Sequence, residues 1–469
     1  MRILNRVDEL TQLQARLTSN QAELLVVYGR RRIGKTELLS HLATSSKALY
    51  IEATDTVRAE QLRDVSAELA RSSGNRLLTD QPLTSWDAVF TAIAQFVGAD
   101  RTLVVFDEFQ YLATRSSELE TTLSRWWRTT GRLLPLTLVL AGSELSFFED
   151  RVLAGQLYGR RTGQLKLEPF LAWDAALFHP GYSADDRVRA YSICGGIPYY
   201  LERFSDNRPL TEHLISEVFE RTGLLHEEAE LMLRQSIPDP SHHSAVLRSI
   251  AYGQNRHNEI AQRTELPAPQ VARILEALER LGLVEKLRPI TTSPRGKKTA
   301  YAISDQFLRF HYRFVEPAKS QLRSSELAAT YVRQNVLPHL DHHASLAWEE
   351  MCRQYVLHTA DDVSEVGRWW GQVPTGIDRR TEEREIDVVG VDGNRTPIVL
   401  GMCKWTNQEV DFDELNLLDR LAQHVKGHTG EEKRYLFSRN GFSERLRAYA
   451  ANDQRCRLIT PEDIYTDLI

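Results

Sequence analysis

Four short apolar runs in the first third of the chain predict strands that are buried on both faces. They are LLVVY (residues 24–28), KALYIEA (47–53), TLVVF (102–106) and LTLVLAGS (136–143). Amphipathic stretches separate the runs, such as RAEQLRDVSAELARSSG (58–74), where apolar residues recur at helical spacing and Gly74 marks the end. This alternation of strands and helices predicts an α/β fold with a parallel sheet.

The segment before the first strand has a helical pattern of its own. Leu4, Val7, Leu10 and Leu13 recur at helical spacing. We therefore expect a short helix that docks on the α/β domain through this apolar face.

The pattern changes after residue 240. Three short helical stretches, at 245–254, 256–266 and 267–283, are followed by two β-like runs around a basic turn containing proline and glycine (284–304). Three helices and a hairpin are the element order of a winged helix. The last third then shows helix, strand, strand, helix and strand, beginning with the helical pattern LAWEEMCRQYV (346–356).

Composition limits the class of protein more than its function. With 469 residues, 42% apolar and 26% charged, the chain fits a soluble protein of two to four domains. No apolar run approaches the roughly 20 residues of a membrane span, and no signal peptide is visible. Four scattered cysteines form no zinc-binding spacing, so we expect a reducing cytoplasm. The net charge of −6 gives no global attraction to nucleic acid, so any DNA contact must be local.

The first apolar run leads into a phosphate-loop motif, G-x-x-x-x-G-K-T. Glycines let the backbone direct N–H groups at the β- and γ-phosphates of ATP, Lys35 adds a positive charge, and the Thr36 hydroxyl ligates Mg²⁺. A chance glycine-rich turn is the alternative, but the strand before the motif and the helix after it are those that the motif requires. The candidate nucleotide-binding residues are Gly29, Arg30, Arg31, Arg32, Ile33, Gly34, Lys35, Thr36 and Glu37.

An acidic pair follows the third apolar run. Asp107 and Glu108 lie at the carboxyl end of a predicted buried strand, where ligands bind in parallel sheets. We expect Asp107 to hold Mg²⁺ through water and Glu108 to polarise the attacking water. The alternative is that the pair only caps the next element.

Three further residues are candidates for catalysis. Ser143 ends the fourth apolar run, where a polar side chain senses the γ-phosphate, although it could equally cap the following helix. Arg160 and Arg161 precede another strand, and one of them could stabilise transition-state charge. A solvated turn is the alternative for both arginines.

The predicted winged helix offers a basic surface. In such folds the third helix enters the major groove and the wing contacts phosphates. The candidate DNA contacts are Gln270, Arg273, Arg288, Arg295, Lys297 and Lys298. Winged helices also serve as protein-interaction modules, and the acidic Glu276 and Glu279 on the same helix keep that alternative open.

Several segments together resemble the archaeal-type ATPases of the signal-transducing, STAND-like branch of AAA+ proteins. They are YGRRRIGKTELL, VVFDEFQYL, LAGSELSFFE, YGRRTGQLKLEPF and CGGIPYYLERF. The resemblance extends over nearly the whole chain. It implies a sheet of five parallel strands in the order 5-1-4-3-2 and a helical lid containing Gly195 to Pro198. It also implies that Arg6 and Glu9 lie near the nucleotide base or cap the first helix.

The C-terminal third resembles the restriction-endonuclease, PD-(D/E)XK, fold found in many of these ATPases. The resemblance implies a metal site formed by Asp387 and Lys404, with Glu349 or Glu350 on the neighbouring helix. Met402 replaces the glutamate of that motif, so we expect a degenerate site that cleaves poorly. Robust cleavage would point to a carboxylate supplied instead by Glu349, Glu350 or Glu385. The alternative is that Asp387 caps a strand and forms an ion pair with Lys404, without any metal.

The sequence thus predicts four domains: a P-loop ATPase domain (1–170), a helical lid (171–240), a winged helix (241–316) and a nuclease-like domain (317–469). The expected function is an ATP-driven, Mg²⁺-dependent switch associated with double-stranded DNA. The alternative is an ATP-dependent protein-interaction scaffold. We expect no membrane association, and self-assembly, in a homo-oligomer or with bound nucleotide, stays open.

Overall fold

The computed structural model describes residues 4–237, 239–292, 299–374 and 380–468. Arg295, Lys297 and Lys298, three of the candidate DNA contacts, lie outside the described residues. The chain divides into two compact units, Met1–Pro169 and Phe170–Ile469. Within the described residues, no helix has the length and apolar content needed to cross a membrane.

The first unit is built on a five-stranded sheet in which every neighbouring pair is parallel. The strands are β1 (Glu23–Gly29), β2 (Lys47–Glu52), β3 (Thr102–Asp107), β4 (Leu136–Gly142) and β5 (Gly163–Leu167). Their spatial order is β2-β3-β4-β1-β5. This is the expected order 5-1-4-3-2, and the predicted α/β fold is confirmed. All residues of β1, β3 and β4 are buried, which explains why these strands appear as continuous apolar runs.

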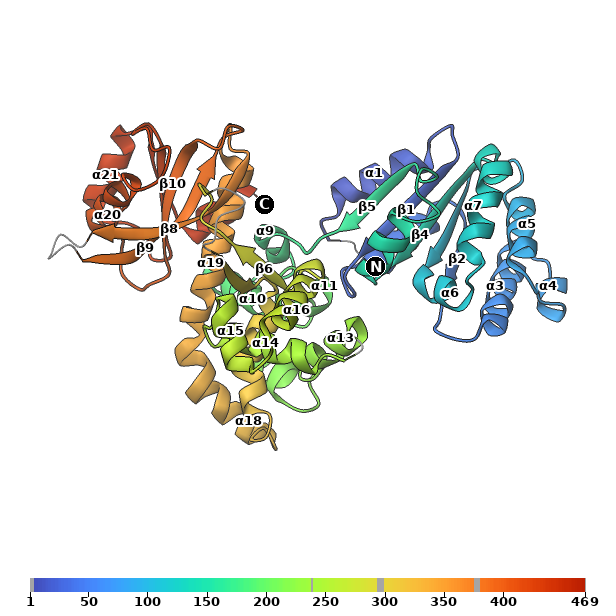
Figure 1. Cartoon of the computed structure of the whole chain (residues 1–469), viewed down its shortest axis with the longest axis horizontal. Helices are drawn as coiled ribbons and strands as arrows, with labels where there is room; N and C mark the ends of the chain where they lie inside the picture. The colour runs from blue at the N-terminus through green and yellow to red at the C-terminus, as the bar shows by residue number, and fades with distance from the viewer. Residues whose placement is uncertain (1–3, 238, 293–298, 375–379, 469) are drawn as a thin grey trace. The chain divides into compact units, whose positions relative to one another are not determined.

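Helices precede or connect the strands of this unit, and the connections between parallel strands require them. They are α1 (Val7–Leu17), α2 (Lys35–Thr44), α3 (Arg58–Ser73), α4 (Leu77–Asp80), α5 (Trp86–Val97), α6 (Phe109–Arg115), α7 (Leu119–Thr129) and α8 (Leu145–Phe147), followed by a π segment at Phe148–Leu153. Figure 1 shows this unit in blue and teal, with α3, α5 and α7 gathered beside the β2 edge. In α1 Leu13 is buried, but Val7 is 65% exposed and does not belong to the expected docking face.

The second unit begins with short helices. They are α9 (Ala172–Ala176), α10 (Ala184–Cys194), α11 (Pro198–Leu201), α12 (Leu210–His213), a π segment (Leu214–Phe219) and α13 (Glu228–Ser236). Gly195 ends α10 with φ 60°, and Pro198 begins α11. The glycine–proline pair therefore acts as a helix stop and a helix start.

A winged helix follows in the predicted order. Its helices are α14 (Ser241–Ala251), α15 (His257–Thr264) and α16 (Ala268–Arg280), and β6 (Val284–Leu287) pairs antiparallel with β7 (Ala300–Ile303). The buried face of α16 consists of Val271, Ile274, Leu275 and Leu278. The segment after β6 reaches the C-terminal sheet, because the Ile290 amide donates to the Arg368 carbonyl at 2.9 Å.

The remaining elements form a mixed sheet flanked by helices. The helices are α17 (Gln306–Phe310), α18 (Ser325–Tyr331), α19 (Leu337–Thr359), α20 (Phe412–Ala422), α21 (Glu444–Asn452) and α22 (Pro461–Leu468). The strands are β8 (Glu365–Pro374), β9 (Thr381–Val391), β10 (Pro397–Lys404), β11 (Lys433–Ser438) and β12 (Cys456–Ile459), in the order β12-β11-β10-β9-β8. Strands β8, β9 and β10 pair antiparallel, whereas β10, β11 and β12 pair parallel.

Candidate functional site

The loop between β1 and α2 has the geometry of an anion site. Gly34 precedes α2 with φ 91°, a conformation that costs glycine little, and Arg32 also has a positive φ of 67°. Gly29 allows close approach of β5, because a Cβ there would lie 2.5 Å from the Leu167 carbonyl oxygen. The loop thus ends at the positive N-terminus of α2, which favours phosphate.

Lys35 is folded back over this loop. Its side chain is only 4% exposed, and Nζ donates to the Gly29 and Arg30 carbonyl oxygens at 2.9 Å each. Burial lowers the pKa of the Lys35 ammonium, and the nearby Glu108 and Asp107 act in the opposite direction. An ammonium held only by backbone carbonyls is free to exchange them for phosphate oxygens.

Asp107 is completely buried at the end of β3. Its Oδ2 accepts hydrogen bonds from the Thr36 hydroxyl at 2.8 Å and the Tyr50 hydroxyl at 2.6 Å, and its Oδ1 accepts from the Glu108 amide at 3.0 Å. Burial and the Asp107 carboxylate raise the pKa of Tyr50, which therefore stays a donor. Sequence analysis missed Tyr50; its signal is that the second strand is the direct neighbour of the strand ending in Asp107.

Glu108 connects the ends of β3 and β4. It has φ 50°, and its Oε2 accepts from the Ser143 amide at 3.2 Å, the Ser143 hydroxyl at 2.8 Å and the Gln110 side-chain amide. Gln110 is 2% exposed and was also missed by sequence analysis. Gly142 makes room for it, because a Cβ there would lie 2.0 Å from Gln110 Oε1.

The other predicted residues of this unit lie around the loop or farther along the chain. Arg6 is buried and donates to the carbonyls of Ile33 at 3.2 Å and Glu168 at 3.0 Å, and it forms an ion pair with Glu9 at 2.6 Å. It thereby connects the start of α1 to the phosphate loop. Arg31 and Glu37 are exposed at the loop surface.

The two arginines before β5 lie in a turn of their own. Arg161 donates to the Leu153 carbonyl at 2.7 Å, and its guanidinium lies 5.9 Å from the centre of the Tyr158 ring. The Arg160 amide donates to the Leu157 carbonyl at 3.0 Å. The role of either arginine in stabilising transition-state charge stays a prediction.

The winged helix presents a mixed surface. Arg273 and Glu276 are both exposed on α16, while the Gln270 amide lies 2.9 Å from the His242 ring nitrogen. Arg288 is half-buried after β6. The opposite charges on α16 leave both DNA and protein open as partners of this face.

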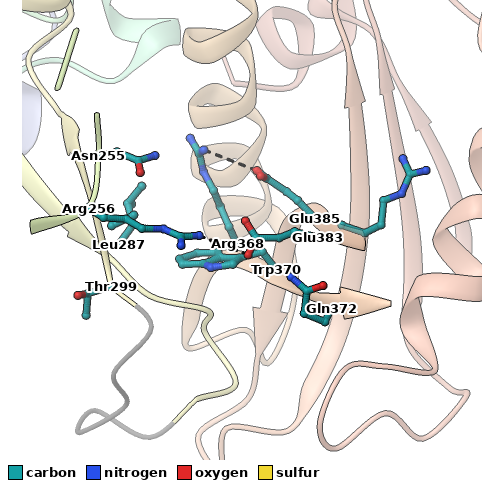
Figure 2. Close-up of a pocket in the computed structure, with 11 residues that line it drawn as sticks. Asn255, Arg256, Leu287, Thr299, Arg368, Trp370, Gln372, Glu383 and Glu385 are labelled. Carbon is teal, nitrogen blue, oxygen red and sulfur yellow. Dashed lines mark ion pairs between the residues drawn. The ribbon is translucent and has the colours of Figure 1, made fainter. Parts of the chain in front are cut away.

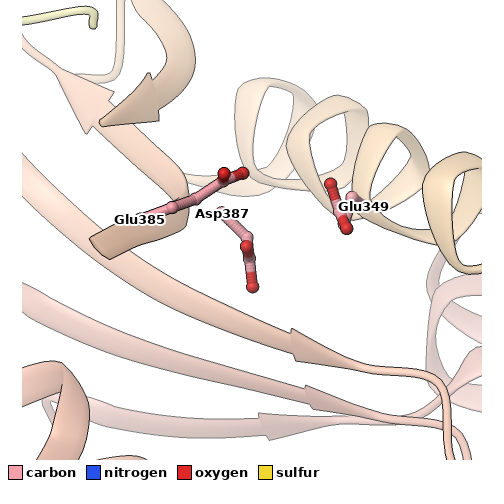
Figure 3. A group of neighbouring side chains, drawn as sticks. All are labelled: Glu349, Glu385 and Asp387. Carbon is pink, nitrogen blue, oxygen red and sulfur yellow. The ribbon is translucent and has the colours of Figure 1, made fainter. Parts of the chain in front are cut away.

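A second cluster of carboxylates lies in the C-terminal sheet. Glu349 of α19 and Glu385 and Asp387 of β9 each bring one oxygen within 4.8 Å of the others. Figure 3 shows the helix residue facing the two strand residues. Between Ile386 and Val389, β9 carries one residue more than β8 opposite, a bulge of the kind that re-aims side chains beside functional sites.

The three carboxylates repel one another. Burial, with the neighbouring Glu349, raises the pKa of Asp387 to about 7, although the Cys403 amide donates to Asp387 Oδ2 at 2.8 Å. Arg368 compensates part of the charge, with Nη atoms 3.3 Å from Glu349 and 3.6 Å from Glu385. Hard oxygen ligands at this spacing fit Mg²⁺ or Mn²⁺, with the arginine as a competitor.

The residues of this cluster differ in part from those expected for the metal site. Lys404 forms an ion pair with Glu414 at 3.1 Å, whereas the alternative interpretation of the sequence paired Lys404 with Asp387. Met402 is 6% exposed in the hydrophobic core, and Glu350 accepts from the Gln306 amide at 2.5 Å away from the cluster. Glu385, two residues before Asp387, supplies the third carboxylate.

Three family models match parts of the chain. Residues 3–204 match the model of an ATPase domain that comes predominantly from Archaea. This match assigns an archaeal-type ATPase domain to the N-terminal part. Residues 244–288 match the IclR helix-turn-helix domain, and residues 311–415 match a family of archaeal and bacterial proteins of unknown function.

Individual relatives match different shares of the chain. An uncharacterized protein of Methanocaldococcus jannaschii is 24% identical over 410 residues, 86% of this chain and 87% of the relative. An uncharacterized ATP-binding protein of the same organism is 41% identical over 44 residues, 9% of this chain and 75% of that protein. The structure of a Walker-type ATPase of Pyrococcus abyssi has a TM-score of 0.52 at 21% identity, covering 66% of this chain and 96% of that one. The last similarity concerns the fold. None of these matches assigns nuclease activity to the C-terminal sheet.

Proposed function

We propose that the protein is an ATP-binding and ATP-hydrolysing switch whose second unit contacts nucleic acid. The observation that supports hydrolysis is the convergence of Lys35, Thr36, Asp107 and Glu108 at the carboxyl ends of β1 and β3. Thr36 and Asp107 offer oxygen atoms 2.8 Å apart, which suits a shared Mg²⁺. The bound ion would neutralise charge on the β- and γ-phosphates. Lys35 would exchange its carbonyl contacts for phosphate oxygens.

Glu108 would act as the base that orients and polarises the attacking water. In the described state its carboxylate is engaged by Ser143 and Gln110. These donors all bind Oε2, so Oε1 is the oxygen that would face the water while Ser143 and Gln110 hold the direction of the carboxylate. Such an arrangement suits a switch, because the γ-phosphate site and the end of the fourth strand would share one carboxylate.

The test separates binding from turnover. Lys35→Ala should abolish or greatly weaken ATP binding, whereas Glu108→Gln should retain binding and lose turnover, because only the base is removed. Binding is measured by equilibrium titration with a fluorescent ATP analogue, and turnover by phosphate release. Equal loss of binding in both variants would overturn the role of Glu108.

The association with DNA rests on the winged helix. The match to a helix-turn-helix domain and the exposed Arg273 on α16 support it. The test is a gel-shift titration of duplex DNA at increasing salt, with and without ATP. Phosphate contacts make affinity fall steeply with salt. An absence of duplex binding at low salt would favour the alternative, a protein-interaction scaffold.

For the C-terminal sheet we propose a degenerate nuclease site that binds nucleic acid and cleaves it poorly. Glu349, Glu385 and Asp387 would hold a divalent cation, and the cation would supply charge neutralisation beside a phosphate. Position 402 offers no carboxylate, and Arg368 already neutralises part of the cluster. Robust Mg²⁺-dependent cleavage of DNA by the unmodified chain would contradict this proposal.

A further inference from the structure

A cavity of about 510 Å³ lies between the winged helix and the C-terminal sheet, within the second unit. Figure 2 shows the side chains that line it, from Asn255, Arg256 and Leu287 on one side to Trp370, Gln372 and Glu383 on the other. Its volume is within the usual range for small-molecule and cofactor sites. This cavity is separate from the phosphate loop, which belongs to the first unit.

The two walls of the cavity are fastened together by the segment after β6. Ile290 is 4% exposed in the hydrophobic core of the C-terminal sheet, and its amide donates to the Arg368 carbonyl at 2.9 Å. Arg395 donates to the Ile290 carbonyl at 2.6 Å. Because both backbone groups of Ile290 are bound, the segment after β6 is held against the sheet beside the cavity.

The sheet wall combines an aromatic ring with polar groups. Trp370 and Gln372 lie two residues apart on β8, so they share one face. Their partners across the strands are Glu385 and Glu383 of β9. Trp370 is half-buried and lines the cavity. A half-buried tryptophan in a polar cavity is a stacking platform for a planar ring, such as a nucleobase.

The opposite wall supplies positive charge. Arg256, at the start of α15, is exposed and reaches Glu383 at 3.6 Å across the cavity (Figure 2). Exposed ion pairs of this kind contribute little free energy, so Arg256 is able to exchange the carboxylate for a phosphate. The whole lining carries three arginines and two glutamates, a net charge of +1.

We infer that this cavity binds a nucleotide, with its base on Trp370 and its phosphate on Arg256. The amides of Asn255 and Gln372 offer donors and acceptors to the base edge. Glu385 lines the cavity and also belongs to the acidic cluster, so a strand that places one nucleotide here passes beside Glu349 and Asp387. The ligand is therefore a nucleotide unit of a single strand, and a free mononucleotide is the other source of the same chemistry. This site goes beyond the proposed duplex contact and does not require it.

The test uses the full chain and a short fluorescein-labelled oligodeoxythymidylate, which lacks the triphosphate that the phosphate loop requires. Fluorescence anisotropy gives its affinity. Trp370→Ala should weaken binding about tenfold through loss of stacking, and Trp370→Phe should recover most of the affinity. If Trp370→Ala has the melting curve of the unmodified chain, misfolding is excluded as the cause of weaker binding. If its melting curve differs, Trp370→Phe provides the comparison.

A matched pair of arginine variants tests the phosphate contact. Arg256 and Arg447 are 60% and 59% exposed, and each pairs with a glutamate, at 3.6 and 3.4 Å, but only Arg256 lines the cavity. Arg256→Gln should reduce the slope of log affinity against log salt by about 0.7, the value for one phosphate of a single strand. Arg447→Gln should leave the slope unchanged, although both variants lose the same charge.

Competition identifies the source of the nucleotide. If unlabelled oligodeoxythymidylate displaces the probe and thymidine monophosphate does not, the ligand is a strand; displacement by the monophosphate at similar concentration identifies a free nucleotide. Either result supports the site. Affinity that is unaffected by Trp370→Ala and Arg256→Gln, or no binding of the oligonucleotide at all, overturns it. Duplex binding and ATP turnover are measured separately, so failure here leaves the proposed function standing.

Discussion

Gln110 is the residue that connects the acidic pair to the end of the fourth strand. Its side-chain amide donates to Glu108 and lies 3.5 Å from the Ser143 hydroxyl. A carboxylate held by several donors has a fixed direction, and a general base is effective only when it is directed at its water. We therefore regard Gln110 as a positioning residue for Glu108 rather than a group that contacts ATP.

This role predicts a specific kinetic change. Gln110→Ala should lower kcat for ATP by about 10- to 100-fold and leave KM nearly unchanged, because the base is misdirected while the phosphate loop is intact. Gln110→Asn should recover little, since its amide is one bond shorter. The measurement is steady-state phosphate release at saturating ATP.

Gln61 provides the matched control. It is 1% exposed and donates only to backbone carbonyls, those of Thr54 at 3.2 Å and Tyr111 at 3.0 Å. Gln61→Ala removes a buried amide of the same size. It should lower the melting temperature and leave kcat for ATP nearly unchanged. Equal kinetic effects of the two substitutions would mean that Gln110 is only structural.

The arginines before β5 give a second prediction at this scale. The Arg161 side chain already donates to the Leu153 carbonyl, whereas Arg160 donates to the Leu157 carbonyl through its backbone amide. If one of them stabilises transition-state charge, Arg160→Ala should lower kcat by about 10³ with nucleotide affinity unchanged, and Arg161→Ala should mainly reduce stability. A concentration-dependent turnover per chain would show that the arginine acts on a neighbouring molecule. Unchanged turnover in both variants would assign them to the turn.

Among the elements, the acidic cluster at the bulge of β9 couples stability to pH. The folded state raises the pKa of Asp387 to about 7, so it binds a proton more tightly than the unfolded chain. The free energy of unfolding should therefore fall as pH rises from about 4 to about 7. Asp387→Asn should remove this contribution to the pH dependence of the free energy of unfolding and should raise the melting temperature at pH 8. The measurement is thermal unfolding between pH 5 and 8.

A divalent cation bound by the three carboxylates should offset the loss of stability that their mutual repulsion causes at high pH. At pH 8, Mn²⁺ should raise the melting temperature of the unmodified chain and have a smaller effect on Asp387→Asn, because binding to the folded state stabilises it. Arg368→Gln should enlarge the Mn²⁺ effect, since the competing guanidinium is removed. Equal Mn²⁺ shifts in the unmodified chain and the Asn variant would exclude the cluster as the metal site.

The sequence predicted elements better than it predicted contacts. The buried strands of the first unit were visible because both faces are covered by helices, which makes the runs continuously apolar. The phosphate loop and the pair Asp107 and Glu108 were predicted because their functions depend on backbone turns and strand ends that leave a local pattern. Tyr50 and Gln110 were missed because their partners depend on strand order and side-chain direction, which no local spacing encodes.

The acidic cluster shows the same limit in the second unit. Glu349 and Asp387 were predicted as possible ligands, and two-residue alternation along β9 places Glu385 on the same face as Asp387. The sequence left open whether Glu349 or Glu350 of the helix joins them, because that depends on how α19 packs on the sheet. Met402 appeared as a lost ligand in the sequence, whereas in the structure it is part of the hydrophobic core. Its replacement by glutamate should therefore destabilise the sheet before it could restore a metal site.

At the scale of the whole molecule, the chain consists of two compact units with the ATPase site in one and the winged helix in the other. A switch requires that the nucleotide in the first unit changes the affinity of the second unit for its ligand. Equilibrium linkage makes such coupling reciprocal: if ATP changes duplex affinity by some factor, duplex DNA must change ATP affinity by the same factor. Coupling energies of about 1–3 kcal/mol are typical and correspond to factors of roughly 5 to 150.

The last prediction uses this reciprocity. Glu108→Gln should bind ATP without consuming it, so equilibrium affinities are measurable in the full chain. We expect saturating ATP to change its duplex affinity at least fivefold, and saturating duplex to change its ATP affinity by the same factor. Lys35→Ala should show the duplex affinity of the ATP-free chain whether or not ATP is present.

A factor of one in both directions would mean that the two units act independently. The protein would then be an ATPase joined to a DNA-binding unit rather than a switch. Unequal factors would indicate that ATP or DNA also binds at a further site, for which the cavity at Trp370 is the first position to test.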